Sequence, residues 1–401
     1  MYMKRRDFLK GAAGISVMAV CPVTGSVGTN QTQNKVDKLT PGRPTKVFLA
    51  GVGKGASEQT VKLAVRSSAE AATNFSWLSR GDTVFIKPVV NSGNPYPATT
   101  SPIAVAAMIE LLREKGAGRV IVGDMSGVEN VRFSPTGLTG SSRKLMESCG
   151  MAKAVRASGA EMHFFEEAGW NAFYEDIPTA GSNWKHGLMM PDILKEVQHI
   201  ILMRRCSRHI IAGSTLGMKA SVGYWRHDTR LEYHRDAATL QEKTAEGNTV
   251  RTLLSKQRLV ISAADKILTT FGPDKGYVYA PDNGLVMASQ SVVAHDMVSL
   301  AWLLENRLTI PEPQRDDFMD TSKVAPRFAN HIVVSWLGGW GPALASETLI
   351  KNDLRSIWDD RVLNHSYEVF GGVPQVILEG ANKTIPADLI KRLSKMTMLP
   401  V

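Results

Sequence analysis

The stretch TVFIKPVVNSGNPYPATTSPIAVAAMIELLREKGAGRVIVGD occupies residues 83–124 and decides the fold class. It opens with a short apolar run, 83–86, and closes on a second one, 120–122. Between them, residues 102–115 have the composition of a helix, and Ser101 stands where an N-cap is favoured. A strand, a helix and a strand in this order predict two parallel strands joined by a helical crossover.

The same alternation continues on both sides of this stretch. Apolar runs predict further strands at 46–50, 162–165, 199–203, 259–262, 285–289 and 373–378. Further helices are expected at 57–72, 142–158 and 296–306, together with one that begins within 214–222, and 167–190 is expected to be mostly loop. This order predicts an α/β fold class, with a mostly parallel sheet that carries helices on both faces.

Composition divides the chain into four segments. Residues 1–28 have the layout of an export signal, and 29–45 are rich in Thr, Asn, Gln, Pro and Gly, as expected of a flexible linker. Residues 46–305 hold the α/β domain. Residues 306–401 form a mixed C-terminal extension, which we expect to pack on the same core.

The leader carries the pattern of the twin-arginine export pathway. Arg5-Arg6 is followed by a polar residue and Phe8-Leu9-Lys10, and then by a weakly apolar segment, 11–20. Charged, apolar and small-residue regions follow one another as in a secretory signal. We therefore expect a periplasmic or otherwise extracytoplasmic protein, with the twin-arginine translocase as a partner.

Two other interpretations of the leader remain open. One is a general secretory signal with two chance arginines, although the weak hydrophobicity of 11–20 argues against it. The other is lipid attachment at Cys21, although Val20 is larger than the residue that normally precedes a lipidated cysteine. Twin-arginine cargo often carries a cofactor, but nothing in the residues names one.

The charge balance limits the classes of partner. The chain has a formal net charge of +9, and the leader holds four basic residues and one acidic residue, which leaves +6 for residues 29–401. This excess is spread out, without a basic run or interleaved aromatic residues, so nucleic-acid binding is not expected. An anionic small molecule or an acidic partner fits better. No run after the leader is long enough to predict a membrane span.

The cysteines exclude one class of cofactor. The three cysteines are Cys21, Cys149 and Cys206, and C-x-x-C does not occur. A cysteine-ligated iron–sulfur cluster is therefore not expected. Whether Cys149 pairs with Cys206 is open.

The glycine-rich turn 51–56 formally matches G-x-G-x-x-A, the pattern of a dinucleotide-binding turn. The acidic residue of a dinucleotide site does not follow at the right distance, so the cofactor stays unknown.

Polar residues follow several strands at their carboxyl ends, where ligands collect in open α/β sheets. Lys87, Asp124 and Asp265 end three of the predicted strands, and Arg204-Arg205 ends a fourth. Any single one of them can be a solvated strand end. As a set they predict a site, and we expect Lys87, Asp124 and Asp265 to converge on one cleft as catalytic candidates.

The loop after the 83–86 strand supplies candidate ligand-binding groups. It is polar and proline-rich and leads into a helix N-terminus, where Asn91, Thr99 and Thr100 could hold an anion. The alternative is a rigid loop that ends in a helix cap, and the two interpretations are compatible.

A second cluster lies between 209 and 234. Arg226 and His227 are candidate anchors for an anionic substrate, and His209 and Lys219, upstream, are candidate acid–base residues. Residues Asp228, Arg230 and His234 complete the cluster. Its spacing matches no zinc pattern, so no metal ligands are assigned. A solvated polar surface and a metal site are the alternatives.

Several of these segments together resemble the domain of unknown function 362 family. They are 86–88, 98–102, 115–117, 120–124, 215–219 and 284–296. The resemblance covers 46–305 and implies an α/β fold but no general reaction. Some members carry ferredoxin-like cysteine motifs, which suggests redox work, and this chain lacks them. The second lysine of the family's central motif matches Lys219, although Ala220 replaces the usual Asn.

Three hypotheses of function follow. The first is an exported enzyme of redox or metabolic type that binds an anionic small molecule or cofactor without an iron–sulfur cluster. The second is a periplasmic binding protein that captures an anion without turnover. The third is a maturation or interaction partner of another exported enzyme.

Overall fold

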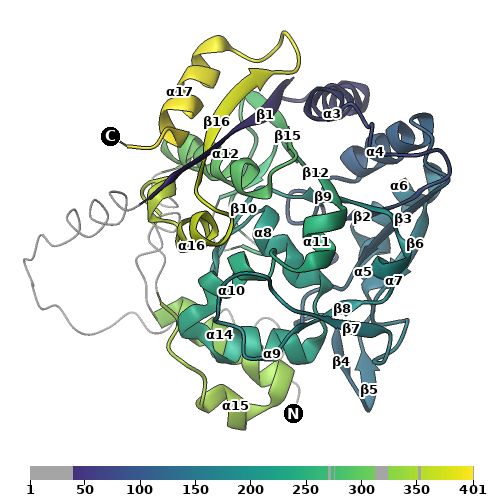
Figure 1. Ribbon diagram of the computed structural model, residues 1–401, viewed down its shortest axis with the longest axis vertical. Helices are drawn as coiled ribbons and strands as arrows, with labels where there is room; N and C mark the ends of the chain where they lie inside the picture. Colours follow the sequence, from purple (N-terminus) through teal and green to yellow (C-terminus); the bar gives the residue numbers. More distant parts are fainter. Residues whose placement is uncertain (1–38, 270–271, 275, 312–323, 351–353, 401) are drawn as a thin grey trace, which may run out of the picture.

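A computed structural model describes residues 39–269, 272–274, 276–311, 324–350 and 354–400. Its centre is an eight-stranded sheet in the order β16-β1-β15-β12-β9-β2-β3-β6 (Figure 1). In that order the strands are Val373–Gly380, Pro41–Gly53, Asn283–Ser289, Gln257–Ala264, His199–Arg204, Thr83–Lys87, Arg119–Asp124 and Glu161–Phe164. Only β15 runs against its neighbours. The predicted α/β class with a mostly parallel sheet is confirmed.

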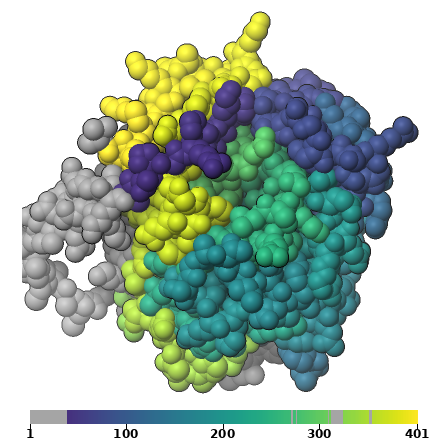
Figure 2. Space-filling model, in the orientation of Figure 1, coloured from purple at the N-terminus to yellow at the C-terminus, as the bar shows by residue number. Residues whose placement is uncertain are grey.

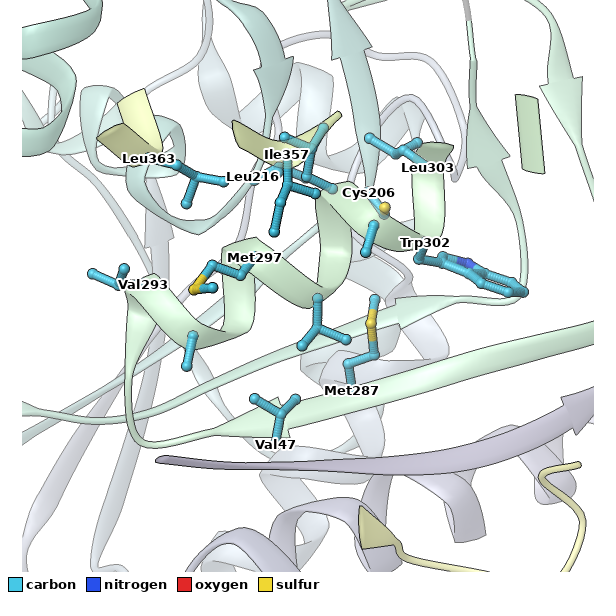
Figure 3. Close-up of a cluster of buried hydrophobic side chains, with 14 of the residues drawn as sticks. Val47, Cys206, Leu216, Met287, Val293, Met297, Trp302, Leu303, Ile357 and Leu363 are labelled. Carbon is cyan, nitrogen blue, oxygen red and sulfur yellow. The ribbon is translucent and has the colours of Figure 1, made fainter. Parts of the chain in front are cut away.

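Helices cover both faces of the sheet because successive strand residues point to opposite sides. On one face, α3 (Glu58–Ala72) and α4 (Pro102–Glu114) pack over alternate apolar strand residues. Ser57 and Ser101 cap these helices as predicted. On the other face, α12 (Val292–Glu305) lies over Val47 of β1 and Met287 of β15 (Figure 3).

The candidate site lies in smaller elements beside the parallel part of the sheet. They are α8 (Gly217–Ala220), η1 (Ser221–Tyr224), α9 (His227–Arg235) and α14 (Val324–Gly338). With β7 (Phe173–Asp176) and β8 (Leu188–Pro191) they enclose a third apolar cluster that includes the buried side chains of Tyr224, Trp225 and Tyr233.

The remaining elements are short connections and the C-terminal helices. The strands are β4 (Arg132–Ser134), β5 (Gly137–Thr139), β10 (Ser207–His209), β11 (Gly213–Thr215), β13 (Ile267–Leu268) and β14 (Val278–Tyr279). The helices are α5 (Ser142–Ser148), α6 (Met151–Ala157), α7 (Ile193–Glu196), α10 (Leu240–Glu246), α11 (Arg251–Lys256), α15 (Trp340–Leu344), α16 (Arg361–Val369), α17 (Ala387–Thr397), η2 (Ala237–Thr239), η3 (Asn306–Thr309) and η4 (Ile357–Asp359).

The C-terminal segment is part of the central sheet. Strand β16 pairs in parallel with β1, and this pairing extends β1 back to Pro41. Residues 41–45, expected to belong to the linker, therefore lie in the sheet. Figure 2 shows the C-terminal residues packed against the N-terminal strand. Residues 1–38, with the predicted leader and most of the linker, lie outside the described residues.

Three further segments differ from the prediction. The expected helix 142–158 is two helices, because Gly150 adopts a φ of 82° at the start of α6 and so ends the regular helical path after α5. The expected loop 167–190 contains most of the antiparallel hairpin of β7 and β8. The expected helix within 214–222 is limited to α8, which η1 continues.

Two sequence questions are answered within the described residues. Cys149 and Cys206 are both free and buried, so they do not pair. Among the helices of the described residues, none is long and apolar enough to cross a bilayer.

Candidate functional site

Lys87 and Asp124 form a buried ion pair at the carboxyl ends of the neighbouring strands β2 and β3. The lysine Nζ lies 2.7 Å from the Asp124 carboxylate, and both side chains are almost fully buried. The Lys87 ammonium also donates to the carbonyls of Pro88 and Ala220, at 2.9 and 3.3 Å. Its three donors are thus used within the protein, and the pair fixes α8 against the sheet. Burial lowers the pKa of Lys87, and the nearby Asp124 opposes that change.

Glycine is required where η1 crosses this pair. A Cβ atom at Gly223 would collide with the Asp124 carboxylate and the Lys87 ammonium. Asp124 is further held by the backbone N–H groups of Val90 and Met125, at 2.7 and 2.9 Å. The pair is therefore a rigid anchor.

Lys219 differs from Lys87 in having no such partners. It lies on α8, and its Nζ forms no ion pair within the described residues. The Nζ lies 5.5 Å from the centre of the Tyr233 ring. Burial, followed by the positive charges of Arg230 and Arg205, lowers the pKa of Lys219 to about 7. The amine therefore titrates near neutral pH, in the range where a lysine can act as a base.

The position of Lys219 depends on Asp296 of α12. The Asp296 carboxylate accepts hydrogen bonds from the N–H groups of Gly217 and Met218, at 2.7 and 2.8 Å. These are orphan donors of the first turn of α8, so the carboxylate caps the short helix that carries Lys219. Asp296 also lies 3.6 Å from the buried guanidinium of Arg204.

Two buried arginines supply the positive charge around Lys219. Arg230 donates to the carbonyls of Trp225, Ser126, Met125 and Gly223, so it ties α9 to the loop after β3. Arg205 donates through Nη1 to the carbonyls of Ala98 and Pro273. Burial lowers the pKa of each to about 10, so both guanidinium groups stay charged at neutral pH.

Two histidines complete the site, and their hydrogen bonds fix opposite tautomers. Nδ1 of His209 accepts from the N–H groups of Ile211 and Ala212, at 3.1 and 3.2 Å, so its proton is on Nε2. Asn330 donates to the carbonyl of His234, which leaves its Oδ1 to accept from Nδ1 of His234 at 2.8 Å. His234 therefore presents an unprotonated Nε2.

Both imidazoles are neutral. Burial and then the charge on Lys219 lower the pKa of His209 well below its usual value, and the same two causes lower that of His234 to about 3. We call Lys219, Arg205 and Arg230, together with the neutral His209 and His234, the cationic cluster. The carboxylates whose charges act on its arginines are Asp124, which is paired with Lys87, Asp274 and Glu166.

Some buried polar atoms near the carboxyl ends of β2 and β9 have no hydrogen-bond partner within the described chain. They are Nε of Arg205, Oδ1 of Asn91 and the hydroxyl of Tyr224. An unsatisfied buried polar group costs about 1–3 kcal/mol, so a bound ligand or water is the ordinary explanation for such a group. Asn91 also donates to Asp274, whose charge lies close to Arg205.

The structure separates the candidates predicted from sequence. It joins Lys87 to Asp124, and burial followed by the charge on Lys219 lowers the pKa of His209. Asp265 lies elsewhere: it accepts a hydrogen bond from Tyr96 at 2.6 Å, and no contact joins it to Lys87 or Asp124 in the described residues. Of the three residues predicted to converge on one cleft, Lys87 and Asp124 therefore lie together, as a buried ion pair, and Asp265 does not join them.

Four other candidates are engaged in local structure. Thr99 donates to the carbonyl of Asn94, and Thr100 bridges Val89 and Met203, so both hydroxyls brace the loop. Arg226 pairs with Asp228 and stacks on Trp170.

His227 donates through Nε2 to the carbonyl of Val131 at 2.9 Å. Burial and the charge of Arg230 lower the pKa of His227 to about 3. None of these four side chains has a contact with Lys219 in the described residues.

Comparison with known proteins assigns the family. A model of the family described as a domain of unknown function (DUF362) matches residues 84–301, more than half of the chain. The chain belongs to the DUF362 family. The matched range of this DUF362 member holds both the Lys87–Asp124 pair and the cationic cluster. No curated protein sequence matches the chain.

One solved structure resembles this DUF362 chain. It is the lactate racemase apoprotein from Thermoanaerobacterium thermosaccharolyticum, with 10% sequence identity and a TM-score of 0.40. The alignment covers 89% of this chain and 86% of that chain.

In the described residues, no group of three or more His, Cys, Asp or Glu side chains is placed to hold a metal ion. The Nδ1 of His209 accepts two N–H groups, so its Nε2 carries the proton and has no lone pair for a metal.

Sequence reasoning placed Arg205 in the strand-end set and Arg230 and His234 in the second cluster, but it chose none of them as a catalytic or ligand-binding candidate. Arg205 was visible as a strand-end residue, and the other two as members of a dense polar segment. Their proximity depends on how α9 packs against the sheet, which no local pattern encodes.

Proposed function

We propose that this DUF362 member binds a small anion, a carboxylate or a phosphate group, in the cationic cluster. The observation that carries this proposal is a buried guanidinium donor without a partner in the described chain, in a group of cations whose charges act on Lys219. Among the described residues, the Nε of Arg205 is buried without a hydrogen-bond partner, and Lys219 has no ion pair. Burial, followed by the charges of Arg230 and Arg205, lowers the pKa of Lys219. An anion supplies both the acceptors and the missing charge.

A Lys219 amine that titrates near neutral pH and the two fixed histidine tautomers favour the enzyme hypothesis over simple capture. A site that only captures an anion needs positive charge and hydrogen-bond donors. This site also offers a protonated Nε2 on His209, an unprotonated Nε2 on His234 and the amine of Lys219, which can exchange protons with a bound molecule. A binding protein without turnover and a maturation partner are the alternatives.

Calorimetric titration with inorganic phosphate and with acetate tests the proposal. Lys219→Met should weaken binding of the better ligand by about ten- to a hundredfold, because a hydrogen bond to a charged group contributes about 1.5–3 kcal/mol. Lys54→Met is the control, since its Nζ pairs only with exposed Asp282 in the described residues. Equal affinities of the wild type and Lys219→Met would contradict the assignment of the site.

We further propose that residues 1–28 direct the folded protein through the twin-arginine pathway to the periplasm. Support comes from Arg5-Arg6 followed by Phe8-Leu9-Lys10. Replacing both arginines with lysine should leave the full-length precursor in the cytoplasm, as measured by fractionation and immunoblotting. Unchanged export of the double variant would point to the general secretory route.

A further inference from the structure

We propose that the helix pair α14 and α15 docks the protein onto the surface of an anionic lipid bilayer. The two helices lie at the end of the molecule opposite α17 (Figure 1). The inference goes beyond the proposed anion binding and uses none of the residues of the cationic cluster. It rests on the exposed apolar side chains of the helix pair and on the sign of the charge beside them.

Exposed apolar side chains are concentrated in this part of the chain. The described residues include twelve large apolar side chains that are exposed, and five of them lie within 324–350. They are Val324, Phe328, Trp340, Leu344 and Ile350. Single exposed apolar residues are ordinary, whereas a group of them on one segment marks a surface that contacts another body.

Helical spacing places the apolar side chains of α14 on the face turned away from the protein. Val324 and Phe328 are one turn apart and exposed, and Ile332, which is half-buried, continues the row. The opposite face, with Asn330 and Val334, is buried, and α14 packs on α9. Because that face is held by the protein, α14 can meet a bilayer only from the side, with its axis along the surface.

The short helix α15 repeats this arrangement. Trp340 is 61% exposed, and Leu344, one turn further along, is 78% exposed. Ala343 of the same helix is fully buried, so α15 also has one face on the protein and one in solvent. Tryptophan and leucine are side chains that enter the boundary between lipid headgroups and acyl chains, and the indole N–H keeps a polar partner there.

The charge beside these side chains indicates which surface they meet. Residues 324–346 include Arg327 and no acidic residue. Arg327 is exposed and forms no ion pair within the described residues. The guanidinium of Arg132 lies over the ring of Trp336, 5.6 Å from the ring centre, and adds a second positive charge beside α14. Anionic lipid headgroups are attracted to apolar surfaces that carry such charges.

The same charges oppose a second copy of this chain as the occupant. A symmetric dimer through α14 and α15 would bring Arg327 of one copy towards the same residue of the other, without a carboxylate from either helix to pair with it. Glu347 is the first acidic residue after the helix pair, and its carboxylate accepts a hydrogen bond from the backbone N–H of Ala238 at 3.2 Å.

Co-sedimentation of the full-length protein with lipid vesicles tests the proposal. Vesicles of phosphatidylcholine mixed with phosphatidylglycerol should bind the protein more tightly than vesicles of phosphatidylcholine alone, and added salt should reduce the difference. Trp340→Ser combined with Leu344→Ser should weaken binding at least about tenfold, because two large apolar side chains then no longer leave water. Arg327→Gln should weaken it about fivefold on the anionic vesicles.

A matched control replaces exposed apolar residues elsewhere on the protein. Ile177 and Leu63 are 65% and 56% exposed, and changing both to serine should leave vesicle binding unchanged. Residues 1–28 are the same in every variant, so their contribution to lipid binding cancels in the comparison.

A cysteine at the proposed contact gives a local measurement. Leu344→Cys and Ile177→Cys should react at similar rates with a water-soluble maleimide, since both positions are exposed and Cys149 and Cys206 are buried. Peptide mapping by mass spectrometry separates these products from labelling at Cys21. Anionic vesicles should slow the reaction at position 344 in proportion to the bound fraction and leave that at position 177 unchanged.

Four results would overturn the proposal. They are equal binding to neutral and anionic vesicles, full binding by the Trp340→Ser and Leu344→Ser double variant, vesicle-induced slowing at position 177 equal to that at position 344, and slow labelling at position 344 before vesicles are added. The last would mean that another part of the chain covers α15. A dimer in sedimentation velocity that the double variant dissociates, without vesicle binding, would assign the surface to a second copy instead.

Discussion

Asp124→Asn lowers the free energy of unfolding by about 3–5 kcal/mol, because the change leaves a lysine buried without its counter-charge. The side chain of Lys87 is 1% exposed, and its ammonium lies 2.7 Å from the Asp124 carboxylate. Asparagine is nearly isosteric, so the loss comes from charge and hydrogen bonding and not from a cavity. Urea denaturation at pH 7 measures it.

A matched control is available on the same strand. Arg119 of β3 pairs with Glu161 of β6 at 2.7 Å, but both side chains are about half exposed. Glu161→Gln should therefore change stability by less than about 1 kcal/mol. Removing both partners, as in Lys87→Met with Asp124→Leu, should cost less than Asp124→Asn alone, since no charge is then stranded. A loss of under 1 kcal/mol in Asp124→Asn would mean that water reaches the Lys87 ammonium.

Lys219 should make stability rise with pH. In the unfolded chain a lysine holds its proton up to about pH 10.4, whereas Lys219 in the folded protein loses it near pH 7. Between these values the unfolded state binds more protons, so the free energy of unfolding increases by up to about 1.4 kcal/mol for each pH unit. Below pH 7 the penalty of burying the charge is fully present.

Comparison with Lys219→Met isolates this contribution. The variant should be more stable than the wild type at pH 7, and its advantage should shrink steadily at pH 8 and 9, as measured by chemical denaturation. Other buried lysines, such as Lys243, are present in both proteins and cancel in the difference. A constant difference across this range would show that the pKa of Lys219 is not lowered.

The architecture was predictable because it follows from local patterns. Apolar runs that alternate with helices predict parallel strands, and the polar residue after each run predicts which side chains meet at the sheet edge. Lys87 and Asp124 end adjacent strands, and the structure brings them together. Asp265 also ends a strand, but its carboxylate accepts a hydrogen bond from Tyr96, which lies in the loop after β2.

The site was less predictable because its members converge through packing. Arg230 reaches Ser126 across about a hundred residues of sequence, and His234 owes its tautomer to Asn330 in a distant helix. The length of β1 depends likewise on β16 near the other end of the chain. Patterns of hydrophobicity and charge within one segment do not indicate contacts with residues so distant in the sequence.

The central claim is that the cationic cluster holds an anion, and crystallography with an anomalously scattering anion tests it most directly. Crystals grown with selenate should show an anomalous peak within hydrogen-bond distance of the Lys219 amine and the Nε of Arg205. Selenate bound only at surface lysines, with the cluster empty at the same concentration, would contradict the account.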